Sequence, residues 1–401
     1  MAPMHYPYII VGGGLAGASA IDGIREHDTE GAILLLSRDN HPPYHRPPLS
    51  KDLWFGKQTL DQLPVHDDTY YREHKAELVL RRDVEELNPE TRTIWDDHGT
   101  TYTYDKLLLA TGGRPRILDA KGSTLEGIHY FRYLEDYLYF SRLERVEHVL
   151  VVGGGFIGME MAAALTHAGK QVTMVYPEEY PLRRVLPRDL GLFVAEYYRG
   201  KGVEMISGES IAEFEDHGGT ILARTRNNNH ADTELVLVGA GIEPHTELAD
   251  AAGLEVSNGI EVDEFARTSD ANIYAAGDVA EFPYLALGRR MRIEHWDHAK
   301  EHGKAAGANM AGAAKPYDHL PPFYSDHFEL GWEAVGDCNP MLTVEAVWRE
   351  MHREGVVFYL EDEVIRGVLL WNTWGKVDWA RDLIKEAKPM TVEERAKRIA
   401  G

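Results

Sequence analysis

Two glycine-rich segments of this chain have the residue types and spacing that hold a dinucleotide. Each reads GxGxxG, one over residues 12–17 and the other over residues 153–158. The first glycine of such a pattern permits a tight turn, the second lets the backbone approach a pyrophosphate, and the third lets a helix pack against a strand. One pattern alone is weak evidence, but two in one chain predict two bound dinucleotides. The residues concerned are Gly12, Gly14 and Gly17 in the first segment, and Gly153, Gly155, Phe156, Ile157 and Gly158 in the second.

Each glycine pattern lies between an apolar strand and a helix, which is the context that gives the pattern its meaning. The arrangement occurs twice, so we expect two β-α-β units that arose by internal duplication. The expected segments are a strand to Val11, a helix to Ile24 and a strand at 32–36 in the first unit, and 149–152, 159–167 and 171–176 in the second.

An acidic residue about twenty positions beyond such a pattern binds the ribose hydroxyls. Glu178 fills this position in the second unit, and its carboxylate favours NADH over NADPH because it repels a 2′-phosphate. Arg183 and Arg184 nearby act against that preference. In the first unit the candidate is Asp39, and the alternative is that residues 38–40 form an ordinary exposed turn.

The order of the remaining segments predicts that the second unit is inserted into the first. Residues 272–278 are expected to form a short strand that runs into a turn with Gly277 and Asp278. This segment is expected to complete the first unit although it follows the whole second unit. From about Tyr324 the pattern changes to strands at 343–348, 355–360 and 364–371 and a helical tail. The expected fold class is therefore α/β, with two Rossmann-like dinucleotide-binding domains followed by a C-terminal α+β domain. The expected boundaries are 1–118 with 246–323 for an FAD-binding domain, 119–245 for an NAD-binding domain and 324–401 for the C-terminal domain.

Composition excludes several classes of protein. The chain has 401 residues, a net charge of −23 and one cysteine, Cys338. One thiol cannot form an internal redox disulfide, so two dinucleotides suggest a flavin that passes electrons onward. The acidic charge argues against nucleic acid as a partner. There is no long apolar run and no secretory signal, so we expect a cytoplasmic protein without a membrane span; a homodimer is left open.

Metal binding is not expected. His295 and His298 have a spacing of i and i+3, but no third ligand is clustered with them at a recognisable spacing.

Several longer motifs make the chain resemble the flavin-dependent pyridine-nucleotide oxidoreductases, particularly the ferredoxin and rubredoxin reductases and the apoptosis-inducing-factor group. Residues 44–51 (YHRPPLSK) resemble a segment of that branch. Ala110, Thr111 and Gly112, and later residues 276–278, match two motifs that close around nucleotide and flavin. Residues 307–317 resemble apoptosis-inducing factor. The resemblance covers essentially the whole chain.

The resemblance implies a role for particular residues. Lys51 would lie near the reactive edge of the flavin and pair with Glu160. Glu294, His295 and Trp296 would line the place where nicotinamide meets flavin. The other implied contacts are Arg46, Val84 and Asp278 to FAD, and Phe156, Gly241 and Glu243 to the nicotinamide; we further assign Arg184 and Tyr324 to cofactor binding.

The chain also departs from the family pattern. Arg38 stands where an acid is frequent, and Tyr324 stands where a tryptophan is usual. Trp296 resembles the bacterial ferredoxin reductases, whereas the segment from Gly307 resembles apoptosis-inducing factor.

Three functions are compatible with these features. The first is an NADH-dependent reductase that passes electrons from FAD to ferredoxin or rubredoxin, for which Arg289, Arg290 and Arg292 could offer a basic docking patch. The second is an NADH oxidase that resembles apoptosis-inducing factor and delivers electrons to quinone or oxygen. The third is an NADH-sensing binding protein that forms a persistent charge-transfer complex.

Overall fold

The computed structural model describes residues 3–400 and divides into two compact units. The first unit contains the chain up to His45, Asp61–Arg114 and Glu243–Pro321. The second contains Arg46–Leu60, Pro115–Ile242 and the chain from Pro322 onward. The short segment Arg46–Leu60 contains most of the family-like motif at residues 44–51, and it belongs with the second unit.

The first unit is built on a largely parallel sheet with the strand order β3-β2-β1-β6-β5-β4, with β18 paired to β6. Buried apolar runs such as Ile9–Val11 and Leu107–Leu109 form its centre, as expected for strands covered on both faces. The strands are β1 (Met4–Val11), β2 (Ile33–Ser37), β3 (Ala76–Leu80), β4 (Val84–Asn88), β5 (Thr93–Asp96), β6 (Thr101–Leu109) and β18 (Ile273–Ala275).

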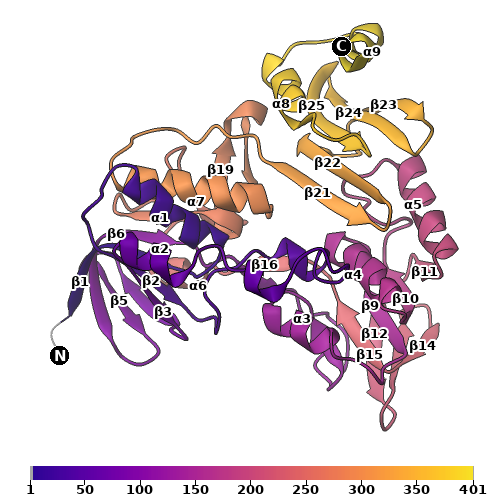
Figure 1. Ribbon diagram of the computed structural model, residues 1–401, viewed down its shortest axis with the longest axis horizontal. Coiled ribbons are helices and arrows are strands. Elements are labelled where there is room, and N and C mark those ends of the chain that lie inside the picture. Colours follow the sequence, from indigo (N-terminus) through magenta and orange to yellow (C-terminus); the bar gives the residue numbers. More distant parts are fainter. Residues whose placement is uncertain (1–2, 401) are drawn as a thin grey trace. The chain divides into compact units, whose positions relative to one another are not determined.

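Helices α1 (Leu15–Arg25) and α7 (Trp296–Met310) lie side by side in this unit (Figure 1). Their backbones touch because glycine occupies the crossing: a Cβ on Gly303 would lie 2.2 Å from the carbonyl oxygen of Ala16, and one on Gly307 would lie 2.0 Å from that of Ala20. The unit also contains α2 (Asp68–Glu73), α6 (Glu247–Ala251), and a small sheet of β17 (Ile260–Glu261), β19 (Ala280–Tyr284) and β20 (Arg289–Arg292).

The second unit repeats the parallel arrangement in a sheet with the order β11-β10-β9-β15-β8. Its strands are β8 (Ile128–Tyr130), β9 (His148–Val152), β10 (Gln171–Tyr176), β11 (Glu204–Ser207) and β15 (Leu235–Val238). Its helices are α3 (Leu134–Phe140), α4 (Phe156–His167) and α5 (Arg188–Gly200). A smaller antiparallel sheet contains β12 (Ile211–Asp216), β13 (Ile221–Thr225) and β14 (His230–Thr233). The short strands β7 (Gly113–Pro115) and β16 (Ile242–Pro244) pair with each other, and most of their residues belong to the first unit.

The C-terminal part of the second unit is an antiparallel sheet with the order β21-β22-β25-β24-β23, followed by two helices (Figure 1). The sequence pattern predicted β23 (Thr343–Glu350), β24 (Glu354–Glu361) and β25 (Val364–Trp371) but not β21 (Pro322–His327) or β22 (Leu330–Gly336). The helices are α8 (Val377–Glu386) and α9 (Val392–Ala400). Cys338 is buried here, and burial raises the pKa of its thiol, so it behaves as a small apolar side chain.

The expected fold class, α/β with paired Rossmann-like sheets, is confirmed. The expected domain boundaries stay a prediction. Among residues 3–400, no helix is both long and apolar enough to cross a lipid bilayer.

Candidate functional site

The two glycine turns have the same backbone geometry. Gly12 and Gly153 have φ values of +123° and +120°, which only glycine adopts readily. A Cβ would lie 2.1 Å from the Ala110 carbonyl oxygen at Gly12 and 2.4 Å from the Gly239 carbonyl oxygen at Gly153. Each turn therefore passes against the end of the neighbouring strand, where a side chain cannot fit.

The second glycine of each turn faces open space. A Cβ on Gly14 or on Gly155 would meet no atom within 4 Å, and both residues cap the start of a helix, α1 or α4. The open side of a helix N-terminus is where backbone N–H groups and the helix dipole favour a phosphate. The turns thus fit the pyrophosphate of a dinucleotide, one in each unit.

Glu160 and Lys51 form a buried ion pair in the second unit. Lys51 Nζ lies 3.0 Å from Glu160 Oε1, and the two side chains are only 10% and 4% exposed. The contact that the family resemblance implied is therefore present. Such a pair is held only when its remaining hydrogen-bonding capacity is also satisfied, because a buried charge that lacks partners is costly.

Two serine hydroxyls complete the surroundings of Glu160. Ser50 Oγ donates to Glu160 Oε2 at 2.6 Å, and Ser325 Oγ donates to Glu160 Oε1 at 2.7 Å. Both serines are buried. Ser50 directly precedes Lys51, and Ser325 lies on β21, so three separate segments of the chain meet at this carboxylate.

The ammonium group of Lys51 also lies 4.1 Å from the centre of the Tyr324 ring, a cation–π distance. Burial on its own would lower the pKa of Lys51, but the negative charge of Glu160, assisted by Tyr324 and Asp326, outweighs it and raises the pKa above its ordinary value. Lys51 is thus a fixed positive charge at neutral pH.

A neutral hydrogen-bonded chain ties β21 to α4 a second time. Trp332 Nε1 donates to His327 Nε2 at 3.3 Å, so the proton of His327 is on Nδ1, which lies 2.9 Å from Tyr198 Oη. Tyr198 in turn donates to the carbonyl oxygen of Met159 at 3.0 Å. Burial lowers the pKa of His327 to about 3, so the ring stays neutral and the direction of the chain is fixed.

The remaining candidates of the second unit surround its glycine turn. Phe156 packs edge-on against Phe323, with ring centres 6.3 Å apart. Glu178 is half-buried just beyond β10, whereas Arg184 is exposed. Gly241 has φ +87° and open space at its Cβ position. Of the other predicted contacts here, Ile157 lies in the first turn of α4, and Arg46 donates to the carbonyl oxygen of Arg132 at 2.8 Å.

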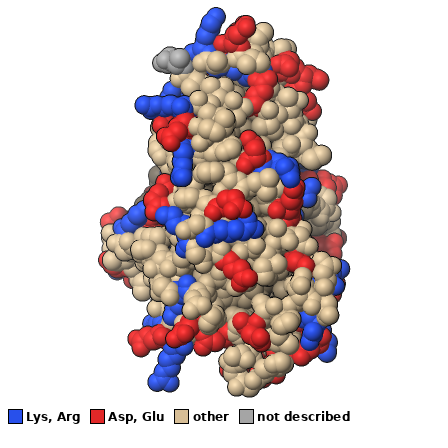
Figure 2. Space-filling model, turned by 90° about the vertical axis from the view of Figure 1, so that its right-hand side faces the viewer, with Lys and Arg blue, Asp and Glu red and all other residues tan. Residues whose placement is uncertain are grey.

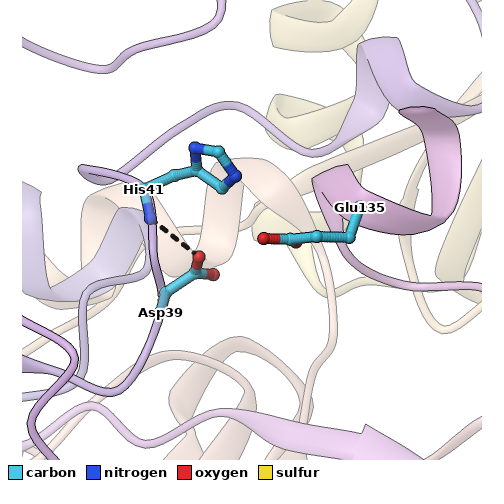
Figure 3. Close-up of side chains that lie close together, drawn as sticks. All are labelled: Asp39, His41 and Glu135. Atoms are coloured by element: carbon cyan, nitrogen blue, oxygen red, sulfur yellow. Dashed lines mark hydrogen bonds between the residues drawn. The ribbon is translucent and has the colours of Figure 1, made fainter. Parts of the chain in front are cut away.

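Asp39 lies in a turn formed by residues 38–40, as in the alternative to a ribose contact that the sequence left open. Its Oδ1 accepts from the main-chain N–H of His41 at 3.0 Å, as Figure 3 shows, and residues 38–40 form a bend after β2. Arg38 contacts His245 within the same unit. A role for Asp39 toward a ribose stays a prediction.

The two family motifs of the first unit directly follow the carboxyl ends of two adjacent parallel strands, β6 and β18. Thr111 follows β6 and donates to the carbonyl oxygen of His245 at 2.8 Å. Gly277 follows β18 with φ +76°, and its N–H donates to His302 Nδ1 at 3.4 Å. Because β6 and β18 are neighbours, both motifs lie at one edge of the sheet. The other predicted residues of these motifs and of β4 are Ala110 and Val84, which are buried, Gly112, which has φ +62°, and Asp278.

Trp296 and Glu294 lie at the start of α7 and just before it. Trp296 Nε1 donates to His45 Nδ1 at 3.0 Å, and Glu294 pairs with Arg292 at 2.7 Å. His295 caps α7. These three residues therefore occupy one short segment.

Two of the three arginines in the predicted basic patch pair with acidic residues, and the role of the patch in docking an acidic partner stays a prediction. The side chain of Arg292 is 9% exposed and pairs with Glu294, and Arg290 lies 3.7 Å from Glu261. On the face drawn in Figure 2, Lys and Arg side chains lie among Asp and Glu side chains. The arginines that the sequence brings together are thus partly neutralised in the fold.

Sequence reasoning missed the side chains that support the predicted residues. Ser50, Ser325, Tyr198 and His302 each contact a predicted residue or its backbone neighbour, and His327 contacts Tyr198. Ser50 and Ser325 each lay inside a segment that resembles the family, residues 44–51 and 323–326, and this was the available signal for them; Tyr198, His327 and His302 come together only through the fold.

Comparison with known protein families identifies the family of the chain that contains these turns. The pyridine nucleotide-disulphide oxidoreductase family matches residues 6–303. The chain belongs to this family. The C-terminal region of the mitochondrion-associated apoptosis-inducing factor family matches residues 343–386.

Named relatives of this oxidoreductase lie in both branches that the motifs suggested. The chain is 33% identical to apoptosis-inducing factor 1, mitochondrial, of Dictyostelium discoideum over 97% of its own length and 80% of the relative. It is 36% identical to the ferredoxin–NAD(+) reductase component of the anthranilate 1,2-dioxygenase system of Burkholderia cepacia, over 82% of each chain. The expected resemblance is confirmed.

Solved structures agree with the family. A ferredoxin reductase from Rhodopseudomonas palustris matches with a TM-score of 0.92 at 28% identity, covering 98% of this chain and 100% of that one. Putidaredoxin reductase, in its covalent complex with putidaredoxin, matches with a TM-score of 0.91 at 30% identity over 99% and 96% of the two chains. The chain is therefore a pyridine-nucleotide-dependent flavoprotein oxidoreductase, and its cofactors are FAD and NAD(H). The family name includes a disulfide, but a chain with one cysteine cannot form one within itself.

Proposed function

We propose that this oxidoreductase takes a hydride from NADH onto FAD and passes electrons singly to a ferredoxin- or rubredoxin-type carrier. The observation that carries the proposal is the buried ion pair between Lys51 and Glu160, a residue of the helix that follows the second glycine turn. A flavin that accepts a hydride gains negative charge, and a fixed ammonium group stabilises such charge in a water-poor site. The relatives named as ferredoxin reductases support the choice of acceptor.

Roles for the individual residues follow from this proposal. The first glycine turn, with Asp39, Arg46, Val84, residues 110–112 and 277–278, would hold FAD. The second turn, with Phe156, Ile157, Glu178, Arg184 and Gly241, would hold NADH. Lys51, Tyr324 and residues 294–296 would face the reacting rings and exclude water from them.

Coenzyme choice and compartment are part of the proposal. Glu178, half-buried beyond β10, would accept bonds from the free 2′-hydroxyl of NADH and repel the 2′-phosphate of NADPH. We place the reaction in the cytoplasm, as the sequence predicted.

A second candidate acceptor has its own support. The match of residues 343–386 to apoptosis-inducing factor favours an NADH oxidase that delivers electrons to quinone or oxygen. The pairing of Arg290 with Glu261 also weakens the positive charge that would attract an acidic ferredoxin.

Steady-state rates with NADH and a panel of acceptors separate these functions. Ferredoxin and rubredoxin reduction that exceeds quinone and oxygen reduction supports the proposal. Quinone reduction without ferredoxin reduction supports the second candidate. A reduced complex that persists with every acceptor would instead indicate an NADH-sensing protein.

A further inference from the structure

The carboxylate of Glu160 is held by more groups than ion pairing with Lys51 requires. Oε1 accepts from Ser325 and faces Lys51, and Oε2 accepts from Ser50. All four side chains are buried in the second unit. Hydrogen bonds to an ionised acceptor are stronger than neutral ones, and they favour the charged form.

The two hydroxyls reach Glu160 from different parts of the chain. Ser50 ends the short helical turn Pro47–Leu49, so it is fixed by the same turn that places Lys51. Ser325 lies on β21, where it alternates with the exposed Tyr324 and Asp326. Its position does not depend on the turn at all.

The strand that carries Ser325 is itself fixed relative to α4. His327 lies two residues further along β21 on the same buried side, and through Tyr198 it is connected to the carbonyl oxygen of Met159, the residue before Glu160. β21 is therefore connected to two successive positions of α4, directly at Glu160 and through Tyr198 of α5 at Met159. A shift of Ser325 away from Glu160 would also break the chain through His327.

We propose that Ser325 and Ser50 are positioning residues that fix the side chain of Glu160 against Lys51, and so keep the ammonium group of Lys51 in place for hydride transfer. This inference rests on the proposed function for its catalytic meaning, but the effect on Lys51 is independent of it. The C-terminal sheet thereby contributes a functional group to the helix of the second glycine turn.

The direct test follows the titration of Lys51 in the FAD-loaded protein. Lysines are labelled with ¹³C at Cε, and the Lys51 resonance is assigned as the one missing from Lys51→Met. In Ser325→Ala and in Ser50→Ala, the midpoint of the Lys51 titration is expected to fall by about one pH unit, because a hydrogen bond to a charged group is lost and Glu160 is free to rotate. The double variant is expected to shift further.

Thr233→Val is the matched control. Thr233 has a buried hydroxyl in the same unit, and the hydrogen-bond partners of its Oγ1 are main-chain atoms of His148 and Leu235. Loss of this hydroxyl is expected to leave the Lys51 titration unchanged even if it lowers stability. A purely structural role for the two serines would make their variants behave like this control.

Kinetics supply a second readout. In anaerobic mixing with NADH, both serine variants are expected to reduce flavin about tenfold more slowly above the new Lys51 midpoint, with an unchanged Kd for NADH. Lys51 titrations that coincide in the wild type and in both serine variants would overturn the inference. Failure of NADH to reduce the wild-type flavin would instead remove the proposed function, and the titration would still decide the role of the serines.

Discussion

The two glycine turns have similar backbones, but only the second is followed by a buried charged side chain two residues after its third glycine. Ser19 and Glu160 each lie two residues after the third glycine of their turn, and both are buried, at 3% and 4% exposure. The turns share positive φ at the first glycine and open space at the second. The shared backbone explains how each turn can hold a pyrophosphate, whereas the side chain at this position decides whether the helix also carries a charge.

The backbone of each turn is thus suited to binding a dinucleotide, whereas the side chains near the two turns differ in the chemistry they could support. Ser19 sits on α1, which packs closely against α7 through small residues. Glu160 sits on α4, where Lys51, Ser50 and Ser325 surround it. The catalytic role proposed for the second turn needs little change in its backbone, since the groups around Glu160 come from other segments.

The largest expected effect concerns the third glycine of each turn, where the two turns should respond alike. A Cβ would lie 2.1 Å from the Gly12 carbonyl oxygen in Gly17→Ala and 1.9 Å from the Gly153 carbonyl oxygen in Gly158→Ala. Each substitution is expected to lower the free energy of unfolding by about 3 kcal/mol or more, because backbone must move. Urea denaturation measures this, and near-native stability of either variant would contradict the geometry.

The next largest effect should distinguish the turns. Glu160→Gln leaves Lys51 without a counter-charge and is expected to slow flavin reduction by NADH about a hundredfold. Ser19→Ala is the matched change in the other turn and is expected to leave this rate within about twofold. Anaerobic stopped-flow spectroscopy measures both; similar losses in the two variants would remove the distinction.

Alanine at the second glycines should separate the two cofactors. Both Gly14→Ala and Gly155→Ala fit the fold, since each Cβ enters open space, but the methyl group fills the side that faces a pyrophosphate. Gly14→Ala is expected to weaken FAD binding about tenfold or more. Gly155→Ala is expected to retain FAD and to raise the Kd for NADH by a similar factor. The flavin content of the purified variants and titrations with NADH measure these effects. Loss of FAD in Gly155→Ala together with weaker NADH binding in Gly14→Ala would reverse the assignment of the two cofactors to the two turns.

Acid should destabilise both units through one buried histidine in each. Burial lowers the pKa of His302 and of His327 to about 3, below the ordinary value of 6.5. The neutral rings therefore contribute their full stability above pH 6.5, and this contribution is lost as the pH falls toward 3, by roughly 1.4 kcal/mol per pH unit for each histidine.

Thermal melting from pH 7 to pH 4 measures this loss. His302→Gln should flatten the pH dependence of the first unit, and His327→Gln should flatten that of the second. A melting temperature with the same pH dependence in the wild type and in both variants would show that other groups govern acid sensitivity.

Much of the parallel framework could be predicted from the sequence. The predicted bounds of β10 agree with the structure, and β2 is displaced by one residue. These strands are continuous apolar runs next to a glycine turn, so local pattern and burial agree. The pairing of Lys51 with Glu160 was accessible because each residue lies in or beside a recognisable motif.

The supporting contacts could not be predicted because they depend on long-range pairing. β21 has the sequence Pro-Phe-Tyr-Ser-Asp-His, which is a weak strand signal, and it forms because β22 pairs with it. Without that strand, Ser325 and His327 have no visible relation to Glu160. Similarly, His302 is an unremarkable helical residue until α7 brings it to the N–H of Gly277.

The central claim is that this chain transfers a hydride from NADH to its FAD, and an anaerobic titration of the FAD-loaded protein with NADH tests it most directly. The account predicts that the visible absorbance of oxidised flavin disappears with one equivalent of NADH and returns when an electron acceptor is added. Flavin that stays oxidised in excess NADH, or purified protein that takes up no FAD, would contradict it.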